Sequence, residues 1–208
     1  MKICMKFLVV FALLAFATES FAQTFGVKAG MNFSNMLTKD DDGLYSNNYD
    51  MRPGFHVGPT AEIPINNFLS FEADLLLSTK GFKYKEIKYN LLYLDIPFTA
   101  KLRYDAGFGN MYVLIGPHLG IGITGKTIYG DEDEAIEWGS DAEDDELKRL
   151  DYGLTVGTGV EIRSVVIGMY YGLGLANISP YTEYGFETKN RVLGLSLGYR
   201  FGVKAKAE

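Results

Sequence analysis

The sequence predicts an all-β protein, an eight-stranded antiparallel up-and-down transmembrane β-barrel. Three observations support this fold class. From Phe25 to Phe201, apolar or aromatic residues recur at every second position, and a strand sends successive side chains to opposite faces. These apolar positions carry no charge, whereas the charges of the strands stand on the other face. Short and long connections alternate along the chain, as they do in barrels that cross an outer membrane.

Residues 1–22 have the pattern of a cleaved signal peptide. Lys2 and Lys6 precede an apolar run at 7–17, and small residues at 20–22 supply a cleavage site. The barrel domain is therefore predicted to be 23–208. The only cysteine, Cys4, lies in the leader, so the mature domain is predicted to have no disulfide and no thiolate chemistry.

Eight candidate strands follow in order, separated by connections of two kinds. Short connections lie at 66–67, 105–110 and 163–164, where turn-forming residues gather. Longer ones are expected at 36–51, 83–90, 126–149 and 179–189. The strict alternation places all short turns at one end of a meander. The predicted strands are 24–35, 52–65, 68–82, 91–104, 111–125, 150–163, 165–178 and 190–203.

The inner face of these strands is rich in glycine and carries balanced charge. Eight strands leave room only for side chains or one small ligand, and buried charges need partners. We therefore predict a largely filled lumen that holds a structural charge network, with a water-filled pore as the alternative. The predicted network comprises six acids, six bases and one histidine: Lys28, His56, Glu62, Glu72, Asp74, Lys80, Asp95, Lys101, Arg103, Asp151, Glu161, Arg163 and Arg200.

Tyrosines gather near the predicted strand ends, as in the aromatic girdles at the two surfaces of a membrane. Ordinary strand propensity explains any single one of them equally well. The tyrosines of this set are Tyr84, Tyr89, Tyr93, Tyr104, Tyr112, Tyr129, Tyr170, Tyr171, Tyr181, Tyr184 and Tyr199.

The connection at 126–149 holds ten carboxylates within residues 131–146. Oxygen ligands of this kind suit a divalent cation, but the spacing does not match a calcium-binding loop. A solvated extracellular loop is the favoured interpretation. The acidic run at 40–42 is interpreted in the same way. No metal site and no cofactor are predicted.

Neither histidine, His56 nor His118, has a serine two residues away on its own strand. A hydrolase needs a nucleophile beside a base, so no catalytic residue and no enzymatic activity are predicted. A barrel enzyme acting on lipid is the least favoured alternative. The glycines between 116 and 125 lie within a strand and do not form a phosphate-binding loop.

The formal net charge is −6, and it becomes −7 once the leader is removed. Nucleic acid needs basic patches, so it is excluded as a partner. The expected partners are outer-membrane lipid and an extracellular or envelope protein, with the chain itself a monomer.

Several short motifs occur in an order typical of one family. They are Gly26 to Asn32, Gly54 to Gly58, Tyr93-Leu94-Asp95-Ile96-Pro97, Gly116-Pro117, Asp151 to Leu154, Gly157 to Glu161, Tyr170 to Ile178 and Leu195 to Phe201. In this arrangement the chain resembles the small outer-membrane β-barrel proteins of Bacteroidetes, which include the PorT-like proteins. Such barrels often end on an aromatic residue, whereas in this chain Phe201 is followed by seven more residues.

The resemblance implies an eight-stranded barrel in the outer membrane with no common enzymatic activity. PorT-like members are associated with type IX secretion. The sequence and the resemblance together predict structural support or loop-mediated binding at the cell surface. A narrow channel or an accessory part of a secretion system is the alternative.

Overall fold

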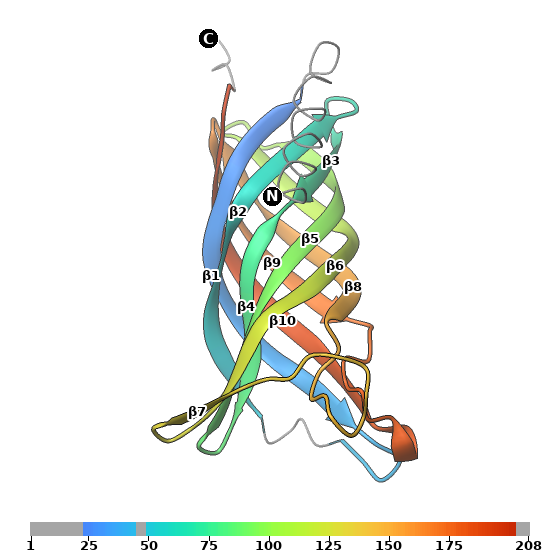
Figure 1. Cartoon of the computed structure of the whole chain (residues 1–208). Helices are drawn as coiled ribbons and strands as arrows, with labels where there is room; N and C mark the ends of the chain where they lie inside the picture. The colour runs from blue at the N-terminus through green and yellow to red at the C-terminus, as the bar shows by residue number, and fades with distance from the viewer. Residues whose placement is uncertain (1–22, 45–48, 203–208) are drawn as a thin grey trace, which may run out of the picture.

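Antiparallel strands close into a ring in the computed structural model, which describes residues 23–44 and 49–202 (Figure 1). The predicted signal peptide lies outside the described residues. Within these described ranges, one short 3-10 turn, Glu183–Gly185, interrupts the strand order. The strands are β1 Thr24–Lys39, β2 Asp50–Pro64, β3 Leu69–Asp74, β4 Leu76–Tyr84, β5 Ile87–Asp105, β6 Asn110–Tyr129, β7 Glu132–Ala135, β8 Leu150–Ile162, β9 Val165–Gly174 and β10 Glu187–Arg200.

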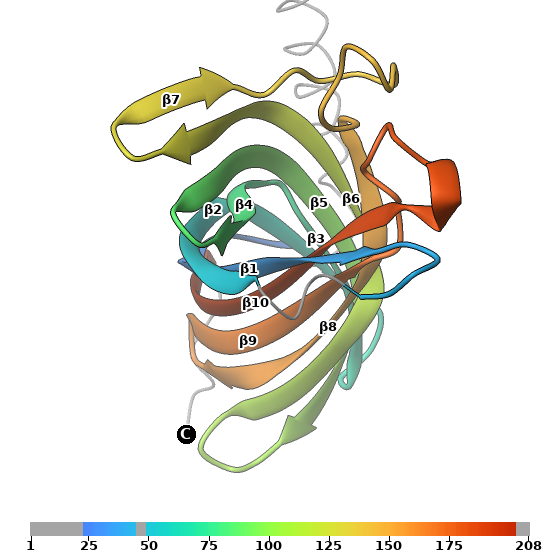
Figure 2. The same cartoon turned by 90° about the horizontal axis from the view of Figure 1, so that it is seen from below.

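The ring has eight walls although ten strands are assigned. β3 and β4 are two parts of one wall, interrupted at Leu75, because both pair with β2 on one side and β5 on the other. β7 pairs only with the end of β6 and projects beside the barrel (Figure 2). Each remaining wall pairs with its neighbours in the chain, and β1 closes the ring on β10. The predicted up-and-down barrel is confirmed.

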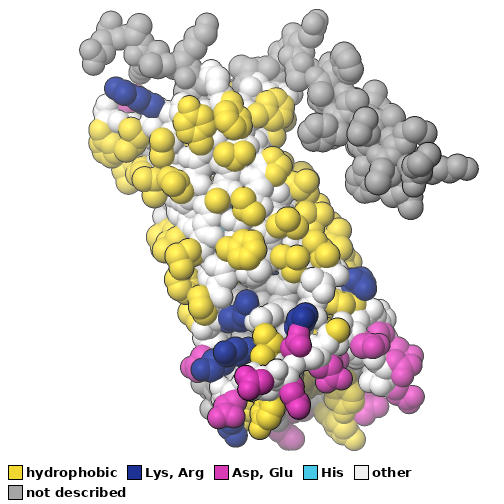
Figure 3. Space-filling view, turned by 60° about the vertical axis from the view of Figure 1, so that its left-hand side comes forward, with side chains coloured by type: hydrophobic (Ala, Val, Ile, Leu, Met, Phe, Trp, Pro, Cys, Tyr) yellow, Lys and Arg dark blue, Asp and Glu magenta, His cyan; other side chains and the backbone are white. Residues whose placement is uncertain are grey.

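The apolar half of the alternation points outward. Phe25 is 47% exposed and Ile115 is 57% exposed, and large apolar side chains of every wall are exposed in the same way. Figure 3 shows them as a wide apolar band, with acidic side chains gathered beyond it at the loop end. A continuous apolar band of this size is costly in water and suits a lipid surface.

The structure differs from the predicted connections at the loop end of the barrel. Residues 83–90 form a hairpin instead of a loop, since β4 and β5 remain paired as far as Tyr84 and Ile87. β5 and β6 likewise remain paired as far as Tyr129. Backbone pairing needs no apolar alternation, so these strands continue where the sequence pattern ends.

The tyrosines divide into two groups. Tyr104, Tyr129 and Tyr199 are exposed near the strand ends, where girdles were predicted. Tyr93 and Tyr112 are buried inside the barrel instead. The inner face therefore holds aromatic side chains that the girdle interpretation assigned to the surface. No helix in the described ranges is long and apolar enough to cross a membrane.

Candidate functional site

Eight charged side chains fill the lumen at the end where the short turns lie. We call them the turn-end charge set, and it contains four bases and four acids. Each of the bases contacts at least two of the acids, so that the set is neutral and fully interlocked. The members are Lys28, Lys101, Arg103, Arg200, Glu62, Glu72, Asp74 and Glu161.

Strand register explains why this set needs a shared cation. Glu62 lies directly opposite Glu72 in the β2–β3 pair, and facing like charges are destabilising. Lys101 of β5 contacts both carboxylates, with Nζ 3.3 Å from Glu62 Oε2, and it also lies 3.4 Å from Glu161 Oε1. The same ammonium stands 4.7 Å from the centre of the Tyr112 ring. One lysine on β5 therefore contacts side chains of four other walls of the barrel.

Arg103 and Arg200 complete this layer from the other side. Arg103 Nε lies 2.7 Å from Glu161 Oε2. Its Nη2 contacts Glu62, and its Nη1 donates to the Ser70 hydroxyl. Arg200 Nη2 lies 3.1 Å from Glu161 Oε2. Buried ion pairs stabilise only when geometry and additional hydrogen bonds satisfy them. In this layer Glu62 and Glu161 each contact three cations, while Arg200 Nε is buried without a hydrogen-bond partner among the described residues.

A smaller polar group lies farther along the lumen towards the loops, and we call it the loop-end charge set. It consists of Lys80, Asp95 and Asp151 together with the amide of Asn190. Lys80 Nζ lies 2.8 Å from Asp95 Oδ1 and 3.0 Å from Asp151 Oδ2. The Asn190 amide donates to Asp151 Oδ2 at 2.9 Å. This set holds one base and two acids.

The structure places twelve of the thirteen predicted network residues in the lumen. Arg163 is the exception: it is exposed in the β8–β9 turn, with a φ of 53°. The prediction was wrong here because the alternation of strand faces was extended one residue past the end of β8. Without Arg163, the balance of six acids and six bases becomes six acids and five bases.

An apolar plug closes the lumen above the loop-end charge set. The long β6–β8 connection contributes Ile136 and Leu147, and Trp138 packs against the same cluster. The Trp138 ring fills the space beside Gly122, where a Cβ would collide with it. Tyr93 is 0% exposed and packs edge-on against Trp138, with ring centroids 5.7 Å apart. The buried members of the plug are Met36, Leu91, Tyr93, Ile136, Leu147, Ala176 and Ile178.

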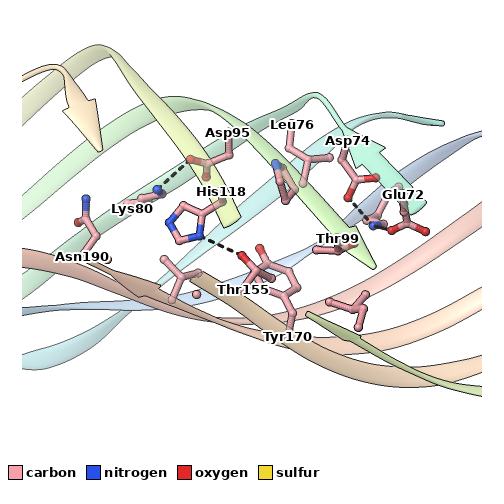
Figure 4. A pocket seen from close by; sticks show the side chains of 16 residues that line it. Glu72, Asp74, Leu76, Lys80, Asp95, Thr99, His118, Thr155, Tyr170 and Asn190 are labelled. Carbon is pink, nitrogen blue, oxygen red and sulfur yellow. Dashed lines mark hydrogen bonds and ion pairs between the residues drawn. The ribbon is translucent and has the colours of Figure 1, made fainter. Parts of the chain in front are cut away.

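A small cavity separates the two charge sets (Figure 4). It offers about 60 Å³ to the centres of water-sized molecules, which is room for a few waters. Asp74 and Lys28 line it from the turn end, and Lys80, Asp95 and Asn190 line it from the loop end. Side chains therefore fill most of the lumen and leave this cavity and smaller spaces, such as the one beside Ser196, between them.

The inner face also brings together a serine, a histidine and an asparagine that are far apart in the chain. His56 Nε2 lies 2.9 Å from Ser196 Oγ, and His56 Nδ1 lies 2.8 Å from Asn32 Oδ1. The Asn32 amide donates to the Ser78 hydroxyl and two carbonyls, so its oxygen faces His56. This assigns the proton to Nδ1 and leaves Nε2 to accept from Ser196.

These are the atoms of a hydrolase relay, but the surroundings do not suit catalysis. The space beside Ser196 is about 20 Å³, which is too small for an ester. Strand amides around it belong to the β1–β10 and β9–β10 ladders and cannot serve as an oxyanion hole. His118 is buried nearby and lies 3.0 Å from the Thr155 hydroxyl. Both histidines therefore act as hydrogen-bonding core residues.

Ser196 is expected to be unreactive. A fluorophosphonate probe should label the folded protein in detergent no more strongly than the Ser196→Ala variant, because the probe cannot reach Oγ through the packed lumen. The measurement is in-gel fluorescence at matched protein amounts. Labelling that the alanine variant and the His56→Gln variant both abolish would show a working nucleophile.

The acidic loops bring no metal-binding group together. Among the described residues, no group of three or more histidine, cysteine, aspartate or glutamate side chains is placed to hold a metal ion. The Asp145 carboxylate accepts from the backbone of Asp141 instead. Burial, together with the charges of Glu134 and Glu137, raises the pKa of Glu146, as expected where carboxylates crowd without a cation. Loop and hairpin carboxylates remain available at the surface.

Sequence reasoning missed several residues of this site. Asn32, Ser196 and Tyr170 stand on inward-facing positions, so the alternation could have found them. Their mutual contacts, such as the 3.0 Å bond from the Tyr170 hydroxyl to Asn32 Oδ1, depend on strand register. Trp138 and Leu147 lie in a segment without periodicity, and no sequence signal marked them as buried.

Comparisons with known proteins agree with this architecture. Residues 21–179 match the family described as "Outer membrane protein beta-barrel domain". Solved structures that are similar to the chain include Ail of Yersinia pestis, 18% identical over 86% of this chain and 98% of that one, with a TM-score of 0.45. Neisserial surface protein A is 19% identical over 85% and 95% of the two chains, with a TM-score of 0.48. The N-terminal barrel of Pseudomonas aeruginosa OprF is 10% identical over 85% and 97%, with a TM-score of 0.38. No curated protein matches the chain.

Proposed function

Since this chain belongs to the outer membrane protein β-barrel domain family, we propose that it is a closed, non-conducting barrel that acts through its loops in binding at the cell surface. The protein resides in the outer membrane. Short turns of such barrels face the periplasm and long loops face the exterior. The turn-end charge set then lies on the periplasmic side, and the apolar plug lies at the outer mouth.

The closure of the lumen in two layers carries the proposal. Neutral ion pairs fill the periplasmic half, and the plug fills the outer mouth with side chains from a folded loop. An ion that crosses the barrel would have to displace both layers. This argues against the narrow channel that the sequence left as an alternative.

The loops supply the surface for binding. β7 and the end of β6 form a hairpin that projects beyond the barrel wall, and its residues Glu132, Asp133 and Glu134 are exposed (Figure 2). Lys126 pairs with Asp133 and neutralises only part of this charge. A partner of this surface is expected to be basic. The proposal includes that the barrel has no enzymatic activity, and the tight packing around Ser196 supports this part.

Planar-bilayer recording tests the closure. The purified protein is expected to give no discrete conductance steps, because both layers obstruct the lumen. A general porin inserted in the same bilayer is the positive control. Regular single-channel steps from the wild-type protein would contradict the closed barrel and restore the channel interpretation.

Cross-linking in whole cells tests the binding role. A photoreactive amino acid at Asp133, on the hairpin, is expected to yield a discrete adduct upon irradiation. The same residue at Phe108, exposed in the β5–β6 turn at the opposite end, is the matched control. No adduct from the hairpin, or equal adducts from both sites, would contradict loop-mediated binding. Adducts from the turn alone would instead favour the accessory role in secretion.

A further inference from the structure

The two charge sets of the lumen differ in balance. The turn-end charge set is neutral, with four bases and four acids in contact. The loop-end charge set has two carboxylates, Asp95 and Asp151, that share the single ammonium of Lys80. Asp151 is 0% exposed, and a buried charge without a partner costs several kcal/mol. One positive charge is therefore missing from this set.

Unused oxygen atoms stand at the same place. Asp151 Oδ1 and Asn190 Oδ1 are buried without a hydrogen-bond partner among the described residues, and so is the hydroxyl of Tyr93, whose ring lies under Lys80. Asn190 is 3% exposed and joins Asp151 through its amide, so the free oxygens of Asp151 and Asn190 belong to one bonded pair. Asp95 and Asn190 line the cavity, which has room for one ion with water (Figure 4).

Neighbouring cations do not supply the missing charge. Arg52 donates to the carbonyl oxygen of Lys80 at 3.3 Å, and in the described residues it makes no ion pair with Asp95 or Asp151. Lys28 lines the other end of the cavity, where Glu72 and Asp74 hold it. His118 bonds to Thr155 through Nδ1 and contacts neither carboxylate closely enough for an ion pair.

We propose that the loop-end charge set binds one monovalent inorganic cation of the sodium class. Asp95 and Asn190 offer oxygen ligands at the cavity, which hard cations prefer, and Asp151, bonded to Asn190, adds the unbalanced negative charge. A single positive charge makes the set neutral, whereas a divalent ion would leave an excess positive charge beside Lys80. The plug above and the turn-end charge set below would retain the ion. This site is independent of what the loops bind.

Thermal unfolding in different salts tests the site. The protein is refolded from urea into detergent in sodium chloride or in choline chloride at equal ionic strength and constant pH, so that an ion can enter before the plug closes. The gel mobility of unboiled samples then gives the unfolding midpoint. We expect a midpoint about 3–6 °C higher in sodium, saturating with concentration, as for a ligand at tenfold its Kd.

Asp151→Asn is expected to abolish the difference between the two salts, because it removes the excess charge. Glu62→Gln is the matched control: Glu62 does not line the cavity, so this variant takes an acid from the neutral set and should leave the difference between salts unchanged. If Asp151→Asn does not refold, Asn190→Ala removes one ligand oxygen and should reduce the difference. Equal midpoints of the wild-type protein in both salts would overturn the proposal. A midpoint that depends on pH but not on the cation would also overturn it, since a proton would then supply the charge.

Discussion

Replacing Glu161 with alanine is expected to lower the free energy of unfolding by about 3–5 kcal/mol, the cost of breaking a buried ion pair. Glu161 is 1% exposed and contacts Lys101, Arg103 and Arg200. Its removal takes a partner from three buried cations. The four bases of the turn-end charge set then share only three carboxylates, and one positive charge is left unbalanced. The measurement is urea unfolding in lipid vesicles, followed by the fluorescence of Trp138, the only tryptophan of the chain.

The matched control is Glu187→Ala. Glu187 also pairs with two bases, Lys39 and Lys189, but this cluster lies at the surface near the loops. Exposed pairs contribute about 0–1 kcal/mol, so the control should remain close to wild type. A similarly small loss of unfolding free energy in both variants would show that the turn-end charge set does not hold the barrel walls together.

Replacing Leu147 with aspartate is expected to release the outer loop from the barrel mouth. Leu147 is 8% exposed within the plug, and a carboxylate there would be buried without a partner. The loop should then be cut rapidly by an added protease within residues 139–146, while the barrel wall remains resistant. The readout is the size of the fragments over time in intact vesicles.

Ala142→Asp provides the control in the same loop. Ala142 is exposed, so the added charge stays in water, and the cutting rate should match that of the wild-type protein. Rapid cutting of the wild-type protein and both variants alike would show that the plug does not anchor this loop. The Leu147 variant should still show no conductance, since the turn-end charge set is unchanged.

The barrel could be predicted from local chemistry because each strand repeats the same alternation. The position of Lys101 inside the lumen follows from its place between outward-facing Ala100 and Leu102. The same rule failed at Arg163, because a turn ends the alternation and the residue adopts a positive φ. Strand parity thus determines which face a side chain takes only while the strand continues.

Contacts between strands could not be predicted in the same way. His56 meets Ser196 across 140 residues, and a shift of one residue in register would turn the facing side chain outward. The apolar plug could not be predicted from the sequence either. Trp138 and Leu147 are two apolar residues in an acidic segment, and only the folded loop shows that they meet the barrel mouth.

The pairing of β1 with β10 has a consequence for assembly. These strands pair from Gly26 opposite Arg200 to Lys39 opposite Glu187, so the first strand of the ring can complete its pairing only with the last. Until then, two long edges remain open to any other strand. The Arg200 guanidinium, at the end of β10, also reaches Glu62 and Glu161. A chain that stops before Arg200 would leave the seam shortened and the turn-end charge set one positive charge short, so the last strand is needed to close both the seam and the ion-pair layer.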